Sequence, residues 1–165
     1  WEDVNLDDGL VHVRGQLQWI DGKPRITPTK TTRSRRTIPL PAVTIDALRQ
    51  HRVRQLEERL MLGGEWNDHG LVFTTSLGTP LDARNVRRWF TRLLEDANLP
   101  VLRFHDLRHS CATLLLAQGV APRLIMETLG HSQISLTMNC YAHVLPTMQR
   151  ESASLMDAIL TATEG

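Results

Sequence analysis

The dipeptide Asp21-Gly22 lies between two segments in which apolar and polar residues alternate, and it constrains the fold more than any other local feature. Asp-Gly is a strong signal for a two-residue β-hairpin turn, because both central residues of that turn take a positive φ. Before the turn, Val11, Val13 and Leu17 would lie on one side of a strand. After it, we expect a second strand over residues 25–29.

A third short strand is expected over residues 36–41, where prolines confine it to an edge or a strand end. The sequence therefore predicts a small three-stranded antiparallel sheet within residues 10–40. The loop between the second and third strands would carry a run of basic residues without an acid, namely Lys30, Arg33, Arg35 and Arg36. Such a run is either a solvated charged face or part of a surface that binds a polyanion.

Beyond residue 41 the patterns are helical. Helices are expected over 42–62, 83–99, 105–119, 122–129 and 145–162, with a short one from Ser135 onward. Their boundaries are marked by Asp82 as an N-cap and by Gly63, Pro100, Pro122 and Gly130. The predicted fold class is α+β and mostly helical, with the sheet packed against a helical bundle in a single domain over 1–165.

Two of these helices have a predicted apolar stripe. In the helix over 105–119 the stripe would comprise Leu107, Cys111, Leu114, Leu115 and Gln118, and in the last helix Leu155, Met156, Ile159 and Leu160. Cys111 and Cys140 form no CxxC pair, so both are interpreted as small buried hydrophobes in a reducing, cytoplasmic setting. Arg84, Arg88 and Arg92 would form a row on one helix face. The sequence has no apolar run long enough to cross a bilayer.

Tyr141 is the single tyrosine of the chain, and polar residues surround it. A lone tyrosine is usually a half-buried filler, but a phenol can also be a nucleophile when a base removes its proton. His105 and Arg108 are three residues apart, so a helix would place them on one face, and a guanidinium can hold phosphate oxygens. His131 follows the glycine that ends a helix, and Lys30 could donate a proton. Taken singly, each of these residues also has an ordinary structural explanation.

The order and spacing of these residues resemble the pattern of a known protein family. The segments "HDLRHSCATLLLAQG" and "LIMETLGHSQISLTMNCYAHV" resemble the C-terminal motifs of the tyrosine recombinases, the phage integrase family, at His105, Arg108, His131 and Tyr141. The segment "TPTKTTRSRRTIPLP" is similar to the hairpin that carries that family's catalytic lysine, matched here by Lys30. The resemblance covers nearly the whole chain.

The resemblance implies site-specific strand exchange on double-stranded DNA, without metal or cofactor. Tyr141 would form a 3′-phosphotyrosyl link, and Arg108 would clamp the phosphate. Lys30 would protonate the leaving oxygen, His105 would transfer a proton, and His131 would support the phosphate. It also implies a tetramer on DNA, expected to be a monomer when free, in a bacterial or phage-encoded cytoplasmic protein without a membrane segment. The basic run would contact DNA.

One departure from the family pattern is that no Gly-Leu-Arg motif with a further catalytic arginine precedes the strands. We therefore expect the chain to be part of a longer integrase that also has a separate N-terminal DNA-binding domain, and we expect these 165 residues alone to cleave DNA poorly. Two alternatives remain. One is a non-catalytic DNA-binding remnant, and the other is a zinc enzyme with His105 and His109 as ligands, although Asp106 stands where a metalloprotease has glutamate.

Overall fold

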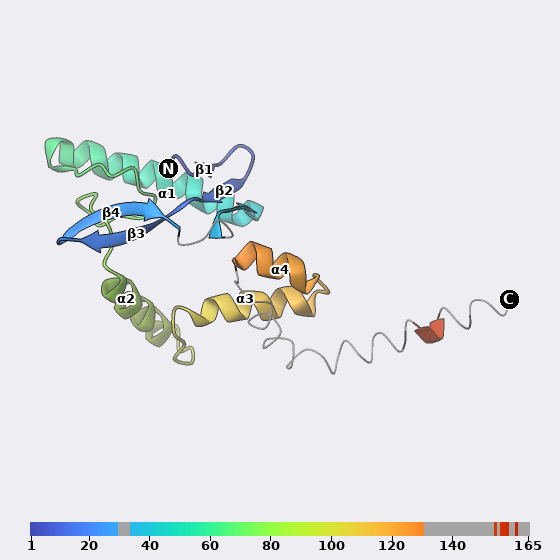
Figure 1. The fold of residues 1–165 in the computed structure, drawn as a ribbon. Coiled ribbons are helices and arrows are strands. Elements are labelled where there is room, and N and C mark those ends of the chain that lie inside the picture. Colours follow the sequence, from blue (N-terminus) through green and yellow to red (C-terminus); the bar gives the residue numbers. More distant parts are fainter. Residues whose placement is uncertain (30–33, 131–153, 155, 159–160, 162–165) are drawn as a thin grey trace. The chain divides into compact units, whose positions relative to one another are not determined.

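The computed structural model describes residues 1–29, 34–130, 154, 156–158 and 161. The chain divides into two compact units, residues 1–101 and residues 102–165. Each unit is described by itself below. Figure 1 labels their helices and strands.

The first unit contains a three-stranded antiparallel sheet. Its strands are β1 (Val4–Asn5), β2 (Leu10–Val13) and β5 (Arg36–Pro39), in the order β1-β2-β5. Val11 pairs with Val4 on one side and with Ile38 on the other, so β2 is the central strand. Gly9, with a φ of 65°, precedes β2 where an added Cβ would stand 2.7 Å from the Ile45 Cδ1 atom of the following helix.

A separate two-stranded hairpin is formed by β3 (Gly15–Ile20) and β4 (Lys23–Pro28). The predicted turn at Asp21-Gly22 is confirmed, since both residues have positive φ, of 51° and 72°. Leu17 pairs with Ile26 and Trp19 with Pro24. Because alternate residues of a strand share a face, these four lie on one face of the hairpin.

The expected strands are present, but their pairing differs from the prediction. The strand expected to include Val11, Val13 and Leu17 divides at Arg14, so Leu17 belongs to a different sheet from the two valines. β5 pairs with β2 instead of β4. The basic segment is therefore not a hairpin loop between paired strands, because it connects the hairpin to the three-stranded sheet. The short strand β1 was not predicted.

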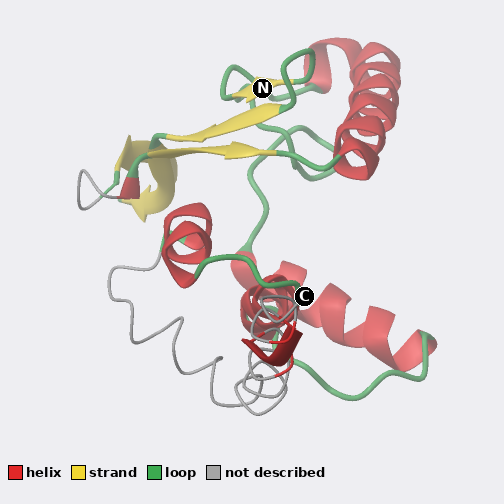
Figure 2. Ribbon diagram, turned by 90° about the vertical axis from the view of Figure 1, so that its right-hand side faces the viewer, coloured by secondary structure: helices red, strands yellow, loops and turns green. Residues whose placement is uncertain are grey.

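Helix α1 (Ala42–Leu62) has the predicted bounds, and Gly63 ends it with a φ of 52° before the 3₁₀ turn η2 (Gly63–Glu65). Its buried polar residue Gln55 donates to the Val72 carbonyl oxygen at 2.9 Å and accepts from Trp1 Nε1 at 2.5 Å. These bonds attach the start of the chain and the 71–74 segment to α1. Figure 2 shows α1 in red beside the yellow strands of this unit.

Helix α2 (Ala83–Asp96) completes the first unit. Asp82 is its N-cap, as predicted, and accepts a hydrogen bond from the Arg84 backbone N–H at 2.6 Å. This bond is the largest of the effects that lower the pKa of the Asp82 carboxyl, and the charge of Arg84 adds to it. Phe90 and Leu94 are the buried side chains of α2.

The second unit is built around a helical hairpin of α3 (Asp106–Ala117) and α4 (Pro122–Leu129). Ala112, Leu116 and Ile125 form its core and are 0% exposed, with Leu115, Val120 and Leu129 packed around them. Pro122 begins α4 and Gly130 ends it in the left-handed conformation, as predicted. Figure 1 shows α4 folding back along α3.

The buried face of α3 is not the predicted one. Leu107 is 44% exposed, Leu114 is 68% exposed and Cys111 is exposed. The row that is buried contains Ala112 and Leu116, because the small Ala112 side chain lets Ile125 of α4 approach closely. The interpretation of Cys111 as a buried hydrophobe was therefore wrong, while Cys140 lies outside the described residues.

Of the predicted last helix, the described residues 154, 156–158 and 161 are helical, and Met156 is 56% exposed. Leu155, Ile159 and Leu160 lie outside the described residues, as does the helix predicted from Ser135. In the part of the chain that the structure describes, no helix is both long and apolar enough to cross a membrane.

Candidate active site

The start of α3 is held by an arginine–aspartate pair. The Asp106 carboxylate accepts from the Arg103 backbone N–H at 2.9 Å and from the Arg103 guanidinium at 2.8 to 3.1 Å. Hydrogen bonding from Arg103 is the main cause that lowers the pKa of Asp106, with the charge of His109 contributing least. A carboxylate in the first turn also interacts favourably with the helix dipole. Asp106 therefore organises the turn that carries the candidate residues.

His105 is the N-cap residue of α3, and its side chain makes no capping hydrogen bond. Its backbone is already helical, with a φ of −68° and a ψ of −25°, and its carbonyl oxygen accepts from the Arg108 N–H at 3.1 Å. The imidazole is exposed and lies against the His109 ring, with centroids 5.6 Å apart and ring planes at 80°. His105 is thus available to a substrate.

Arg108 is half-buried and lies one turn before Ala112 and two turns before Leu116 on the same helical row. The His105 side chain is exposed, whereas Arg108 shares its helical row with buried residues. The row of Arg108 runs into the core, so the stem of its side chain lies over apolar surface. A guanidinium held in this way is better ordered than one on a fully solvated face.

Three of the predicted catalytic residues cannot be placed beside these two. Lys30, His131 and Tyr141 lie outside the described residues, as does Arg33 of the predicted DNA-binding set. The structure does show what precedes two of them. Gly130 ends α4 directly before position 131, and the β3–β4 hairpin ends at Pro28, two residues before position 30.

The described part of the basic segment belongs to the first unit. Arg35 is exposed, whereas Arg36 is half-buried and donates to the Ser34 carbonyl oxygen at 3.1 Å. Burial lowers the pKa of Arg36, but an arginine so affected still keeps its charge near neutral pH. Of these two, Arg35 is the one accessible to a polyanion.

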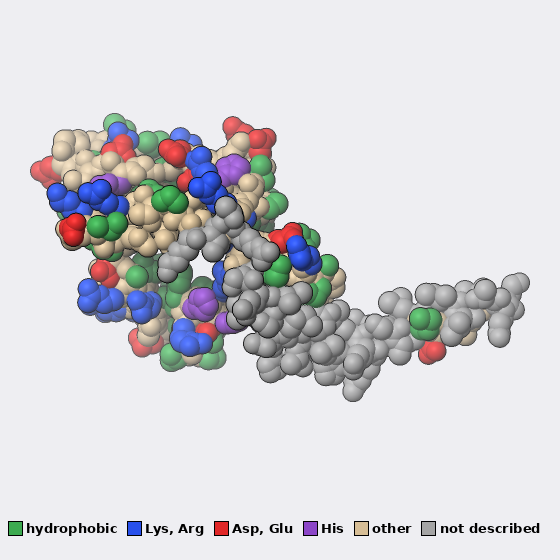
Figure 3. Space-filling model, viewed as in Figure 1, with side chains coloured by type: hydrophobic (Ala, Val, Ile, Leu, Met, Phe, Trp, Pro, Cys, Tyr) green, Lys and Arg blue, Asp and Glu red, His purple; other side chains and the backbone are tan. Residues whose placement is uncertain are grey.

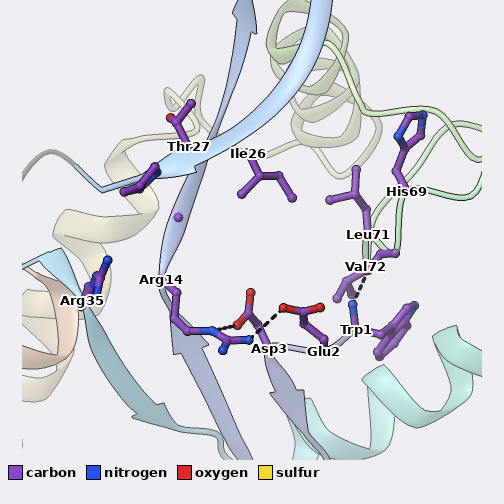
Figure 4. Close-up of a pocket in the computed structure, with 13 residues that line it drawn as sticks. Trp1, Glu2, Asp3, Arg14, Ile26, Thr27, Arg35, His69, Leu71 and Val72 are labelled. Carbon is purple, nitrogen blue, oxygen red and sulfur yellow. Dashed lines mark hydrogen bonds and ion pairs between the residues drawn. The ribbon is translucent and has the colours of Figure 1, made fainter.

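Arg35 borders a cavity of about 520 Å³ that lies within the first unit. Figure 4 shows Arg14 in this cavity directed at Asp3 and Glu2. The Arg14 guanidinium pairs with both carboxylates, at 3.1 Å for Glu2. Arg14 is the residue at which the chain passes from β2 to β3, so these ion pairs lie where the hairpin joins the three-stranded sheet. Sequence patterns did not indicate this pairing.

The arginine row predicted on residues 84–92 is confirmed. Arg84, Arg88 and Arg92 are exposed on α2, and Figure 3 shows basic side chains gathered on this part of the surface. Arg88 donates to the Asn85 side chain at 2.5 Å.

His105 and His109 have the spacing of a pair of metal ligands on one helix. Among the residues that the structure describes, no group of three histidine, cysteine or acidic side chains could hold a metal ion. The contact between the two rings is edge to face instead. In the sequence, the only sign of this ring contact is the spacing of four residues between the two histidines. That spacing by itself assigned His109 no role.

Comparisons with known proteins agree with the motifs. The model of the phage integrase family matches residues 1–148. A tyrosine recombinase XerC-like protein of Caldanaerobacter subterraneus is 41% identical over 131 residues, which cover 78% of this chain and 34% of that protein. An integrase of Streptomyces ambofaciens is 42% identical over 134 residues, covering 79% and 34%. The chain thus spans about a third of the length of these relatives.

The fold also matches solved structures. The Tn1549 transposon integrase in complex with transposon right end DNA matches with a TM-score of 0.73 at 22% identity, over 92% of this chain and 51% of that one. The XerA recombinase matches with a TM-score of 0.69 at 21% identity, over 94% and 49%. At these identities the structures show that the fold is shared. The family match over most of the chain and the two relatives above 40% identity go further, and by them the chain belongs to the phage integrase family.

Proposed function

We propose that this chain carries the strand-transfer chemistry of a site-specific DNA recombinase. The Tyr141 oxygen attacks a DNA phosphorus, and the 5′-oxygen of the next nucleotide leaves. The products are a 3′-phosphotyrosyl link and a free 5′-hydroxyl. Attack by the 5′-hydroxyl of a partner strand then expels the tyrosine and rejoins the backbone. Because one phosphodiester is exchanged for another through a phosphotyrosine, the sequence of steps needs no external energy source.

The proposed roles follow from the chemistry of each group. A phenol with a pKa near 10 is ionised to only about one part in a thousand at neutral pH, so His105 accepts its proton. Lys30 donates a proton to the leaving 5′-oxygen. Arg108 binds the non-bridging oxygens and stabilises the charge that grows on them, with support from His131.

The observation that carries this proposal is the geometry at the start of α3. His105 is exposed and Arg108 lies a single turn away, on a helix whose core is 0% exposed. α4 packs on the same core through Ile125 and ends at Gly130, directly before His131. A phosphate site needs groups held firmly in position, since much of catalysis depends on orientation, and a packed helical hairpin supplies that support.

Double-stranded DNA is the proposed substrate. The α2 arginines and Arg35 offer exposed positive charge in the first unit, while the formal net charge of the whole chain is only +1. Local basic patches on a nearly neutral chain are typical of DNA-binding proteins. The XerH recombinase, bound to its difH substrate in a post-cleavage complex, matches this chain with 27% identity and a TM-score of 0.62. We further propose assembly as a tetramer on DNA from free monomers.

Covalent capture on DNA tests the function. The chain is incubated with nicked duplexes of randomised sequence, and protein that remains attached to DNA after denaturation is collected. Tyr141→Phe should abolish this adduct and leave DNA affinity within about twofold, since a hydroxyl is removed without loss of charge. If Tyr141→Phe still forms the adduct, the nucleophile is another residue. If the active form of the protein binds DNA and never becomes attached, the chain is a DNA-binding module instead.

A fusion protein tests the expectation that the 165 residues alone cleave DNA poorly. The part of the Caldanaerobacter relative that precedes its matching segment is fused to Trp1, which supplies a further arginine if the family pattern holds. Loss of one phosphate-binding donor typically costs about 10² to 10³ in rate, so adduct formation by the fusion should exceed that of the 165 residues by a similar factor. Equal rates would show that the chain needs no further donor.

A further inference from the structure

The imidazole of His105 lies in contact with one other ring on the first turns of α3, that of His109. The two centroids are 5.6 Å apart and the planes meet at 80°, which is the edge-to-face arrangement that aromatic rings prefer. Both side chains are exposed. The orientation of the His105 ring is therefore not imposed by the core of the unit, and the contact with His109 is available to set it.

The backbone below this contact is well ordered. The Asp106 carboxylate holds the Arg103 backbone and guanidinium, and the Arg108 N–H donates to the His105 carbonyl oxygen. His109 lies one turn further into the helix, where its Cα position is determined by the α3–α4 core. The backbone of His109 is therefore rigid, and its ring can hold the His105 ring even though His105 lies at the terminus of the helix.

The charged side chains at and just before the start of α3 are Arg103, Asp106 and Arg108, and Arg103 and Asp106 pair with each other at 2.8 Å. On α4, which packs against α3, Arg123 and Glu127 also pair with each other at 2.7 Å. The two acids of these helices are thus engaged by arginines.

We propose that His109 is a positioning residue that holds the His105 imidazole in one rotamer. A proton carrier needs its ring nitrogen within hydrogen-bond reach of the donor, and an exposed histidine alone has a broad, roughly two-fold χ2 distribution. The value of this arrangement to catalysis rests on the proposed function, in which His105 accepts the proton of the nucleophile. The arrangement itself can be measured without any reaction.

The experiment is nuclear magnetic resonance of the 165-residue chain with ¹⁵N- and ¹³C-labelled histidine. In the wild type, His105 should show the χ1 couplings of a single rotamer and a cross-peak between its ring and the His109 ring. In His109→Ala, the χ1 couplings should become averaged. His109→Phe should keep the wild-type couplings, because it retains an aromatic ring at the same position.

Ser110→Ala is the matched control, since Ser110 is the next residue on α3, is exposed, and donates to the Asp106 carbonyl oxygen at 3.1 Å. It should leave the His105 signals unchanged. Backbone amide shifts of α3 in each variant show whether the helix persists, and His109→Gln replaces His109→Ala if it does not. Unchanged His105 couplings in a folded His109→Ala or His109→Gln protein would overturn the proposal, as would averaged couplings in His109→Phe.

The outcome is separable from that of the proposed function. If DNA attachment is never observed but His105 loosens in His109→Ala and not in His109→Phe, the positioning role is supported and the recombinase chemistry is not. If attachment occurs and His105 does not respond to His109, the recombinase chemistry is supported and the positioning role fails.

Discussion

Two hairpins of this protein, one helical and one stranded, are supported in opposite ways. The α3–α4 hairpin closes on Ala112, Leu116 and Ile125, all 0% exposed. The β3–β4 hairpin leaves its apolar face largely open, with Leu17 41%, Trp19 55% and Ile26 66% exposed. The helical hairpin carries His105 and Arg108, and the stranded one leads to the basic segment.

We infer from this difference that the two hairpins have different roles in the proposed reaction. Groups that must hold a phosphate in position are placed on elements with a packed core. A two-stranded hairpin alone is only marginally stable in water. Local features stabilise this hairpin. They are the Asp21-Gly22 turn, the close approach of β3 to β4 at Gly15, and the ion pairs of Arg14.

The largest effect is expected from Leu116→Ala, which empties the core of the helical hairpin. Replacing a fully buried leucine by alanine costs about 2–5 kcal/mol. The control is Leu114→Ala on the same helix, where the side chain is 68% exposed and the cost should stay under about 1 kcal/mol. Hydrogen exchange of peptides within residues 105–130 measures both. Equal loss of protection in the two variants would mean that the buried row is misassigned.

A smaller effect is expected from Gly15→Ala in the stranded hairpin. An added Cβ would stand 2.9 Å from Ile26 Cγ2 and 3.1 Å from the Thr27 carbonyl oxygen. The strand β4 must shift, at a cost of about 1–3 kcal/mol. Gly64→Ala is the matched control, because nothing lies within 4 Å of its added Cβ. Hydrogen exchange over 15–28 should rise in the first variant alone. If it does not, the two strands are not in close contact there.

The acid sensitivity of the α3 start can be tested with Asp106→Asn. Arg103 lowers the pKa of Asp106 in the folded chain, so this carboxylate stabilises the fold above the unfolded pKa of about 4. That contribution is lost as the pH falls through the lower, folded value. Thermal unfolding between pH 5 and pH 2, with Asp96→Asn as control, should show a flatter pH dependence for Asp106→Asn. An unchanged slope would exclude Asp106 as a source of acid sensitivity.

The smallest effect is expected from Arg14→Ala. The Arg14 side chain is 56% exposed, and its partners Glu2 and Asp3 are 87% and 44% exposed. Such pairs contribute only about 0–1 kcal/mol and are screened by salt. Hydrogen exchange over 15–28 should rise slightly at low salt and match the wild type at about 1 M salt. Arg25→Ala on β4 is the control, and a salt-independent difference for Arg14→Ala would point to packing instead of charge.

Much of the local structure was predictable. The bounds of α1 and α4, the Asp82 cap and the hairpin turn each depend on a few neighbouring residues with strong conformational preferences. The catalytic roles of His105 and Arg108, which were inferred from their spacing of three residues, stay a prediction. His109 was not assigned a role, because a histidine four residues away could as well be solvated.

The sequence by itself determined the bounds of α1 and α4, the N-cap of α2, the dipeptide that turns the hairpin, and the family that the motifs resemble, since these depend on short-range chemistry along the chain. Only the tertiary structure decided that β5 pairs with β2 and that Ala112 and Leu116 face the core. Helix α3 is apolar on several sides, so periodicity could not choose among its faces. That choice depended on which side was small enough for α4 to approach, a property of two packed elements that neither segment has alone.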